Sequence, residues 1–353
     1  MRAVTYSKHG GPEVLEVQSS YPKPSREKGN ILVKVHACSI NPVDWKIRLL
    51  PVPIQPMPFV TGSDFAGEVV ECDDSSNFKV GDRVYGLLPI LEKQGSCAEY
   101  ISVNEKILAK IPDNLSYIEA AAVPLVGLTV WQAYERAGVT DRIEGNVGKS
   151  ILCHAGAGGV GSFAIQLGKA FGLKVYTTCS ARNLEFVKSL GADYGIDYNK
   201  DKFEEVKSDY DYIIDTMGGD YELRSMKCIK SNGTYMNIMN SGWSTKWSTG
   251  KTDGISGVDS TFGSTIGFIY AAYRMTVQYL VGPYYKFLVV KPDGSMLSRL
   301  SKFIQTGKLK PKIDRVFPLE HIAKAHQYMQ NGHARGKVII AVDTKLIQQQ
   351  AKI

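Results

Sequence analysis

Residues 150–161 read SILCHAGAGGVG, and this stretch decides the fold that the sequence predicts. Its first four residues are small or apolar, which is typical of a short buried strand, and a helical pattern runs from Gly159 to Phe171. Between strand and helix lie the glycines of a G-x-G-x-x-G pattern, at Gly156, Gly158 and Gly161. Glycines at this spacing permit a tight turn and let phosphates approach the free N–H groups at a helix start. The stretch therefore predicts the opening strand, turn and helix of a dinucleotide-binding unit.

Strand and helix patterns continue to alternate on the C-terminal side of this stretch. The segments predicted as strands are Lys174–Thr178, Tyr212–Ile214 and Thr234–Met239, and a helix is predicted over Leu184–Leu190. Strands that alternate with helices at this spacing indicate an α/β domain with a parallel, doubly wound sheet.

The first third of the chain has a different texture, with short β-branched or alternating segments between Gly, Pro, Asn and Asp. The segments predicted as strands here are Val14–Val17, Ile31–Val35, Ala66–Val70 and Ala98–Val103. A helix is expected to start at Ser116, with Glu119 as its capping-box partner. The remaining predicted elements are helices over Leu128–Ala137, Leu297–Ile304 and Leu319–Met329 and a final strand over Lys337–Val342.

Length and composition describe an ordinary globular protein. A chain of 353 residues favours two domains, and 44% hydrophobic residues suffice for two cores. The net charge of +7 is spread without a basic block, which suits an anionic ligand but does not indicate nucleic acid. Six cysteines without a CxxC pair are expected to be reduced, scattered thiols.

The N-terminus and two stretches that follow residue 240 bear on membrane association and cellular location. Ser241–Gly263 is rich in Ser, Thr and Gly and is expected to be a loop. Ile266–Val290 is the least polar stretch, but charges and Gly282-Pro283 interrupt it, so we expect a buried or interface segment. Membrane association is therefore open but not favoured. The N-terminus has no signal- or transit-peptide pattern, so a cytoplasmic location is expected unless a presequence was removed.

The turn after the second strand distinguishes NAD from NADP. An NAD site usually carries Asp or Glu there to bind the ribose 2′-OH, yet no acidic residue occurs from Ser162 to Leu184. Ser180 and Arg182 occupy the turn instead. A guanidinium can hold a 2′-phosphate through charge-assisted hydrogen bonds. The sequence therefore predicts NADPH as the cofactor, although Arg182 alone would be an ordinary first-turn helix residue.

These motifs, in their order, resemble the zinc-free quinone oxidoreductase branch of the medium-chain dehydrogenase/reductase superfamily. The matching runs are Asn41-Pro42-Val43-Asp44-Trp45-Lys46, Gly62-Ser63-Asp64-Phe65-Ala66-Gly67, Gly81-Asp82-Arg83-Val84, Gly127-Leu128-Thr129, the glycine-rich turn and Leu190-Gly191-Ala192-Asp193. Within the branch, the first run is similar to chloroplast-envelope quinone oxidoreductase homologues. Residues 332–337 resemble the reticulon-4-interacting mitochondrial oxidoreductase.

The resemblance implies a GroES-like, β-rich catalytic domain (1–124 and 310–353) and a Rossmann NADPH-binding domain (125–309), with homodimers common. It also implies which residues bind the cofactor. Besides the three motif glycines, these are Ala157, Gly159 and Val160 at the phosphates, Ser180, Arg182 and Tyr198 at the 2′-phosphate, and Thr129, Asn41 and Arg335 near the cofactor. For Tyr198 the alternative is a partly buried aromatic at a strand end, and for Arg335 an exposed loop charge.

No zinc is expected. Zinc alcohol dehydrogenases of the superfamily have Cys and His at the positions of Asn41 and Ser63, and neither residue here is a normal zinc ligand. His36 and Cys38 lie two apart on a presumed strand, so a metal pair is conceivable, but two unrelated buried side chains are the better interpretation. Without a Lewis acid for alcohol oxidation, reduction of an electrophilic acceptor is favoured.

The resulting hypothesis is hydride transfer from NADPH to a quinone or an activated alkene, with Asn41 and Lys46 as catalytic candidates. Many relatives have Tyr where this chain has Lys46, so Lys46 either stabilises the developing charge or is simply solvated. Two alternatives stay open: an NADPH-binding regulatory protein with little turnover, and a peripheral membrane or structural protein.

Overall fold

The computed structural model describes residues 1–49, 57–92, 94–238, 282–332 and 334–346. The expected loop Ser241–Gly263 lies outside the described residues, as does the first part of the apolar stretch that begins at Ile266. Within the described part of the chain, no helix combines the length and the apolar character needed to cross a membrane.

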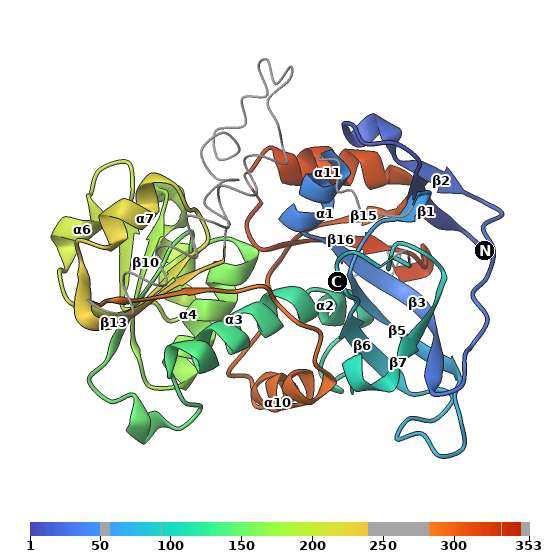
Figure 1. The fold of residues 1–353 in the computed structure, drawn as a ribbon, viewed down its shortest axis with the longest axis horizontal. Coiled ribbons are helices and arrows are strands. Elements are labelled where there is room, and N and C mark those ends of the chain that lie inside the picture. Colours follow the sequence, from blue (N-terminus) through green and yellow to red (C-terminus); the bar gives the residue numbers. More distant parts are fainter. Residues whose placement is uncertain (50–56, 93, 239–281, 333, 347–353) are drawn as a thin grey trace. The chain divides into compact units, whose positions relative to one another are not determined.

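The chain divides into two compact units, and Figure 1 traces their elements. The first unit comprises Met1–Leu128 and Lys291–Ile353, and the second comprises Thr129–Val290. The expected boundary at residues 309 and 310 falls later than this division because the helix Gly294–Gln305 packs in the first unit. Tyr85 of that unit donates its hydroxyl hydrogen to Leu297 O at 3.0 Å and contacts Ser301 Oγ at 2.9 Å.

The first unit is built around a sheet in the order β15-β16-β3-β5-β6-β8, with β7 paired to β3. A smaller sheet has the order β2-β1-β4. The strands are β1 (Ala3–Tyr6), β2 (Glu16–Gln18), β3 (Asn30–Ile40), β4 (Phe59–Val60), β5 (Asp64–Glu71), β6 (Arg83–Leu87), β7 (Tyr100–Asn104), β8 (Leu108–Lys110), β15 (Ile313–Pro318) and β16 (Lys337–Ala341).

Helices of the first unit close around this sheet. They are α1 (Pro42–Leu49), α2 (Tyr117–Ala121), α10 (Gly294–Gln305) and α11 (Ile322–Gln330), with α3 (Pro124–Ala137) running on into the second unit. The expected capping box is confirmed, since Ser116 Oγ accepts from the Glu119 N–H at 3.2 Å. Short 3-10 turns lie at Pro12–Val14, Glu105–Ile107 and Leu319–His321. The core beneath joins Val4, Val33, Phe65, Ile101 and Ile340, all nearly inaccessible to solvent.

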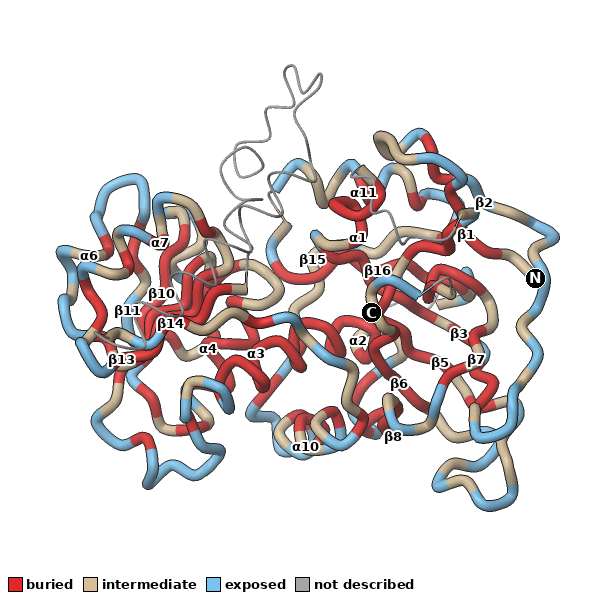
Figure 2. The backbone as a smooth tube through the Cα atoms, in the orientation of Figure 1, coloured by how far each residue is buried: buried red, intermediate tan, exposed pale blue. Residues whose placement is uncertain are grey.

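The second unit holds a parallel sheet in the order β11-β10-β9-β12-β13-β14, as expected for a doubly wound fold. Its strands are β9 (Ser150–Cys153), β10 (Lys174–Cys179), β11 (Tyr194–Asp197), β12 (Tyr210–Asp215), β13 (Ile229–Asn237) and β14 (Tyr284–Phe287). Its helices are α4 (Gly159–Ala170), α5 (Leu184–Ser189), α6 (Phe203–Val206) and α7 (Asp220–Ser225), with 3-10 turns at Ile143–Gly145 and Ala181–Asn183. Figure 2 shows the central strands buried, as a sheet covered on both faces requires.

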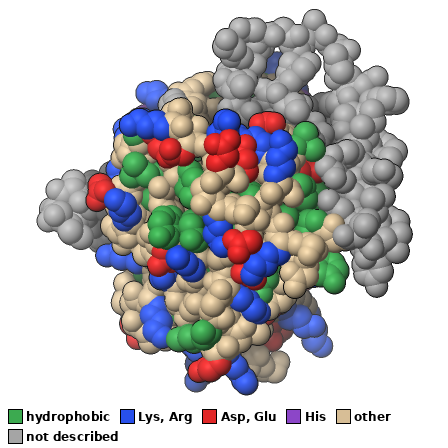
Figure 3. Space-filling model, turned by 90° about the vertical axis from the view of Figure 1, so that its left-hand side faces the viewer, with side chains coloured by type: hydrophobic (Ala, Val, Ile, Leu, Met, Phe, Trp, Pro, Cys, Tyr) green, Lys and Arg blue, Asp and Glu red, His purple; other side chains and the backbone are tan. Residues whose placement is uncertain are grey.

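On the face drawn in Figure 3, positive and negative side chains are interspersed, which differs from the single-sign patch typical of a nucleic-acid interface. All six cysteines are free thiols. They are not all scattered, because Cys38 and Cys97 are buried with their sulfur atoms 3.3 Å apart.

Candidate functional site

The glycine-rich turn joins β9 to α4, and two of its three motif glycines have a steric reason. A Cβ at Gly156 would lie 2.1 Å from Thr177 Oγ1, and one at Gly161 would lie 2.3 Å from the Ala155 carbonyl oxygen. At Gly158, which precedes α4, a Cβ would meet only that carbonyl, at 3.4 Å. Gly156 and Gly161 therefore allow close packing, while Gly158 leaves open space beside the helix start. No side chain caps α4, so its first N–H groups remain available to a phosphate.

Ala155 adopts an unusual backbone conformation in this turn. Its φ of 54° lies in the left-handed region, and it is the one non-glycine residue in the described part of the chain with a positive φ. The Ala155 N–H donates to Thr178 Oγ1 at 3.1 Å, and the Gly156 N–H donates to the Thr178 carbonyl at 2.9 Å. The neighbouring strand β10 thus holds the turn in a shape that costs an alanine free energy.

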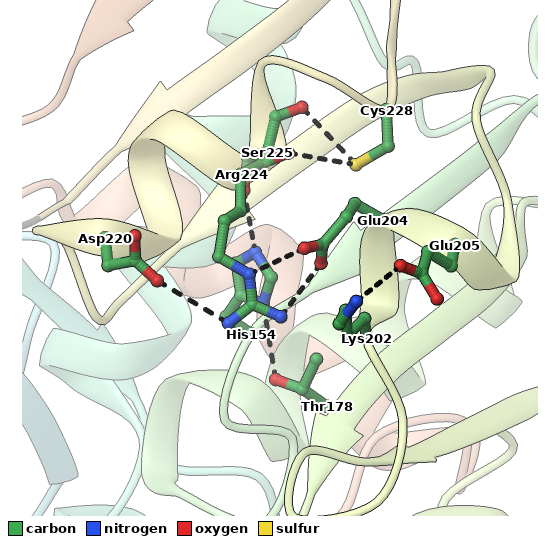
Figure 4. A network of polar contacts seen from close by, with 9 residues as sticks. All are labelled: His154, Thr178, Lys202, Glu204, Glu205, Asp220, Arg224, Ser225 and Cys228. Carbon is green, nitrogen blue, oxygen red and sulfur yellow. Dashed lines mark hydrogen bonds and ion pairs between the residues drawn. The ribbon is translucent and has the colours of Figure 1, made fainter.

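The buried His154 belongs to a polar network, which is drawn in Figure 4. The His154 ring contacts Thr178 Oγ1 through Nδ1 at 3.3 Å and Ser225 Oγ through Nε2 at 3.0 Å. Burial lowers the pKa of His154 to about 4, so the ring is neutral at pH 7 and can accept as well as donate. His154 therefore connects the residue that holds the turn, Thr178, to helix α7.

Arg224 forms the outer part of the network in Figure 4. It donates to Glu204 through Nε at 2.9 Å and through Nη2 at 2.8 Å, and it lies 3.7 Å from Asp220. Arg224 thereby ties α7 to α6.

The predicted 2′-phosphate residues lie at the carboxyl ends of neighbouring strands. Ser180 and Arg182 follow β10, Tyr198 follows β11, and the Tyr198 N–H donates to the Cys179 carbonyl at 3.1 Å. Arg182 is exposed and Tyr198 is half exposed, so both are accessible to a ligand. Tyr198 also borders a surface hollow of about 380 Å³, which Asn199, Lys200, Asp201, Lys202, Glu204, Asp220 and Arg224 complete. The structure thus places Tyr198 beside the turn that carries Ser180 and Arg182.

The first unit contains a second buried polar cluster, centred on Asp64. Its Oδ2 accepts from Ser39 Oγ at 2.5 Å, from Asn41 Nδ2 at 2.9 Å and from Lys337 Nζ at 3.1 Å. Its Oδ1 accepts from the Leu125 N–H at 2.6 Å. Lys337 Nζ also donates to Asn41 Oδ1. The predicted residue Asn41 is therefore held at both ends of its amide.

Asp44 joins this cluster from α1. Its Oδ2 accepts the Asn41 N–H at 2.7 Å, and the Ser63 side chain also hydrogen-bonds to it. Burial raises the pKa of Asp44 to about 7, the hydrogen bond from Asn41 opposes this, and the negative charge of Asp64 adds to it. Asp44 is thus a buried carboxyl that titrates near neutral pH.

Lys46, the other catalytic candidate, lies one helical position beyond Trp45 on α1 and is only 7% exposed. Its Nζ is 5.7 Å from the Trp45 ring centroid. Burial lowers the pKa of Lys46 to about 8. Lys46 is therefore a largely buried lysine, and its part in the reaction stays a prediction.

For the other predicted residues, contact with a cofactor stays a prediction. Thr129 is buried on α3, and Arg335 is exposed just before β16. His36 and Cys38 do not form a pair, because His36 stacks on Tyr117 and contacts Asp343 whereas Cys38 packs on Cys97. Within the described residues, no three His, Cys, Asp or Glu side chains form a group that could hold a metal ion.

Several polar residues of these clusters were not predicted from the sequence. Asp64 and Lys337 each begin a strand whose sequence is largely apolar. A charged residue at the start of such a strand was the signal that could have identified them. His154 and Thr178 flank the glycine-rich turn, but their contact depends on the pairing of β9 with β10.

Comparisons with known proteins agree over nearly the whole chain. Residues 27–113 match the alcohol dehydrogenase GroES-like domain family, and residues 190–340 match the zinc-binding dehydrogenase family. The chain is 36% identical to 2-methylene-furan-3-one reductase of Solanum lycopersicum, covering 96% of this chain and 79% of that protein. It is 34% identical to the chloroplastic NADPH-dependent alkenal/one oxidoreductase of Arabidopsis thaliana, with the same coverage of each.

A solved structure gives the same result. The quinone oxidoreductase from Coxiella burnetii superposes with a TM-score of 0.78 and 31% identity, over 97% of this chain and 99% of that one. The expected GroES-like domain and Rossmann-type sheet are therefore confirmed.

The strained Ala155 gives a first prediction. Replacing Ala155 with glycine should raise the free energy of unfolding by roughly 1 kcal/mol, because glycine adopts a positive φ without a steric cost. Chemical denaturation would measure the change. The matched control Ala164→Gly, in the middle of α4, should be destabilised instead. A loss of stability in Ala155→Gly would contradict the assignment of strain to this turn.

Asp44 gives a second prediction. Between about pH 4 and pH 7 the folded protein holds a proton on Asp44 that the unfolded chain has released. Rising pH favours the state that binds fewer protons, so the free energy of unfolding falls as pH rises through this window. Asp44→Asn removes this dependence. Relative to the parent, the free energy of unfolding of the variant should rise by about 2.5 kcal/mol between pH 5 and pH 8. The exposed control Asp113→Asn should show no such change, and an equal pH dependence for all three proteins would refute the prediction.

Proposed function

The chain belongs to the medium-chain dehydrogenase/reductase superfamily, in its quinone oxidoreductase branch, and on this basis we propose a zinc-independent, NADPH-dependent oxidoreductase. Its acceptor is a quinone or an activated alkene, such as an enone or enal. The relatives named alkenal/one oxidoreductase and quinone oxidoreductase support this acceptor class.

The observation that carries the cofactor assignment is the corner after β10. Ser180 and Arg182 stand where an NAD enzyme would place a carboxylate, and Tyr198 lies on the adjacent strand end. The open side of Gly158 and the uncapped start of α4 supply the phosphate site, with Ala157, Gly159 and Val160 contributing backbone. These residues fit NADPH, which when bound supplies the hydride.

Zinc does not fit the residues at the family's metal position. Asn41 presents an amide whose oxygen already accepts from Lys337, and Ser63 presents a hydroxyl. Zinc sites in proteins use thiolate, imidazole and carboxylate ligands. We therefore assign no metal-dependent step to this site.

The remaining task of the protein is to stabilise the charge that develops on the acceptor oxygen. Reduction of an enone consumes one hydride and one proton, and the oxygen carries negative charge between the two events. Lys46 has a pKa of about 8, so at pH 7 it is mostly protonated and can donate a hydrogen bond and then the proton. The Asn41 amide offers a second donor, since only one hydrogen of Nδ2 is needed for Asp64.

Assembly and location are finer points of the proposal. We propose a homodimer that forms along β14, which is the edge of its sheet among the described strands and carries the 45%-exposed Tyr284. The proposed location is cytoplasmic, with an organelle as the alternative because the Arabidopsis relative is named chloroplastic. No described feature favours the regulatory or membrane-peripheral alternatives.

Cofactor preference is the first test of the function. NADPH should bind at least 10-fold more tightly than NADH in a fluorescence titration, because Arg182 pairs with the 2′-phosphate. The preference should fall in Arg182→Ala and be lost in Ser180→Asp, which restores an NAD-type carboxylate. The control Lys188→Ala, an exposed residue on α5, should retain it. Equal binding of both cofactors by the parent protein would refute the 2′-phosphate site.

Lys46 provides the second test. Lys46→Met should lower kcat for an enone roughly 10-fold or more, with little change in NADPH affinity. In the parent protein, kcat should fall as pH rises through about 8, since Lys46 then loses its proton, and this basic limb should vanish in the variant. The exposed control Lys8→Met should keep both the rate and the limb. An unchanged rate in Lys46→Met would remove this residue from the mechanism.

A further inference from the structure

Lys337, the first residue of β16, is a buried cation that no step of the proposed mechanism uses. It is 2% exposed, and its ion pair with Asp64 joins side chains with relative exposures of 3% and 0%. Removing two charges from water is costly, and a buried ion pair contributes little net stability on average. The net stability of the ion pair therefore does not by itself explain why a lysine is buried at this position.

The contacts of Lys337 determine the orientation of the Asn41 amide. The ammonium donates to Asn41 Oδ1, while Asn41 Nδ2 donates to Asp64 Oδ2 at 2.9 Å. A flipped amide would place its NH2 group against the ammonium and its oxygen against the carboxylate, two repulsive contacts in a buried site. The amide is thus fixed in one orientation, with its second Nδ2 hydrogen directed away from Asp64.

Asp64 can act as a fixed anchor for this arrangement. It accepts from Ser39 Oγ at 2.5 Å and from the Leu125 N–H at 2.6 Å, so its position does not depend on Asn41 alone. Lys337 is the one partner of Asn41 that contacts the amide oxygen in these hydrogen bonds. A cation at a carbonyl oxygen also polarises the amide, which makes its N–H groups stronger donors.

We propose that Lys337 is a positioning residue for hydride transfer, which acts through Asn41. It fixes the Asn41 amide in the one orientation that leaves an Nδ2–H not used by Asp64, which would donate to the acceptor oxygen, and it strengthens that donor by polarisation. The inference rests on the proposed function, in which Asn41 contacts the reacting groups. Lys337 itself touches neither substrate nor cofactor in this assignment.

A double-mutant cycle in kcat tests the proposal. The full-length parent, Lys337→Met, Asn41→Ala and the double variant are assayed with NADPH and either 1,4-benzoquinone or trans-2-hexenal. We expect each single variant to lower kcat at least 10-fold, with the KM for NADPH within 2-fold of the parent. The double variant should be no more than 2-fold slower than Asn41→Ala, since Lys337 has no route to the reaction once the amide is gone. Effects that multiply in the double variant would overturn the proposal.

Control variants separate positioning from folding. Ile340→Ala removes a fully buried side chain from the same strand without touching Asn41, and it should lower the melting temperature while leaving kcat within 2-fold. If Lys337→Met does not fold, the cycle is run with Lys337→Gln, which keeps a neutral donor for Asn41 Oδ1 and should lose less of kcat. A kcat that follows melting temperature across all variants, Ile340→Ala included, would overturn the proposal.

The outcomes also distinguish this inference from the proposed function. If the parent protein oxidises NADPH with neither acceptor, the function itself fails. If the parent turns over but Lys337→Met keeps kcat within 2-fold, the function stands and the role of Lys337 is wrong.

Discussion

The buried carboxylate of Asp64 is the interaction on which the first unit depends. It accepts hydrogen bonds from β3 through Ser39 and Asn41, from β16 through Lys337, and from the first turn of α3 through Leu125. These donors are distant in sequence, so one side chain joins the N-terminal part of the chain to the C-terminal strand β16. A fully buried carboxylate is tolerated only when its lone pairs are satisfied, and here four donors satisfy them. The position of the candidate residue Asn41 follows from this arrangement.

In the second unit, backbone conformation rather than a buried charge positions the candidate site. Its glycine-rich turn holds Ala155 at a positive φ and leaves no room for side chains at Gly156 and Gly161. Thr178 from the neighbouring strand holds this shape, and His154 connects Thr178 to α7. Strain in the turn is thus maintained by buried polar contacts.

The sequence predicted the local features of the protein better than its long-range contacts. The turn, β9, β10 and α4 were predictable because glycine spacing and apolar runs are local signals, whereas β14 was not predicted and β11 appeared only as a possible strand end at Tyr198. The Asn41–Asp64–Lys337 cluster could not be predicted, because it depends on the pairing of β3 with β5 and β16. The divergence of His36 from Cys38 has the same origin, since the β3–β5 register shifts between Val35 and Ala37. The later helix Gly294–Gln305 was predicted as a helix but expected in the other domain.

The most direct measurement follows the hydride itself. NADPH carrying deuterium at the transferable position of nicotinamide C4 would be incubated with the protein and trans-2-hexenal, in the presence of excess metal chelator, and the product analysed by mass spectrometry and NMR. We expect one deuterium at the β-carbon of the saturated aldehyde and a rate that the chelator does not change. A product without deuterium, or turnover that stops when metal is removed, would contradict zinc-independent hydride transfer from NADPH.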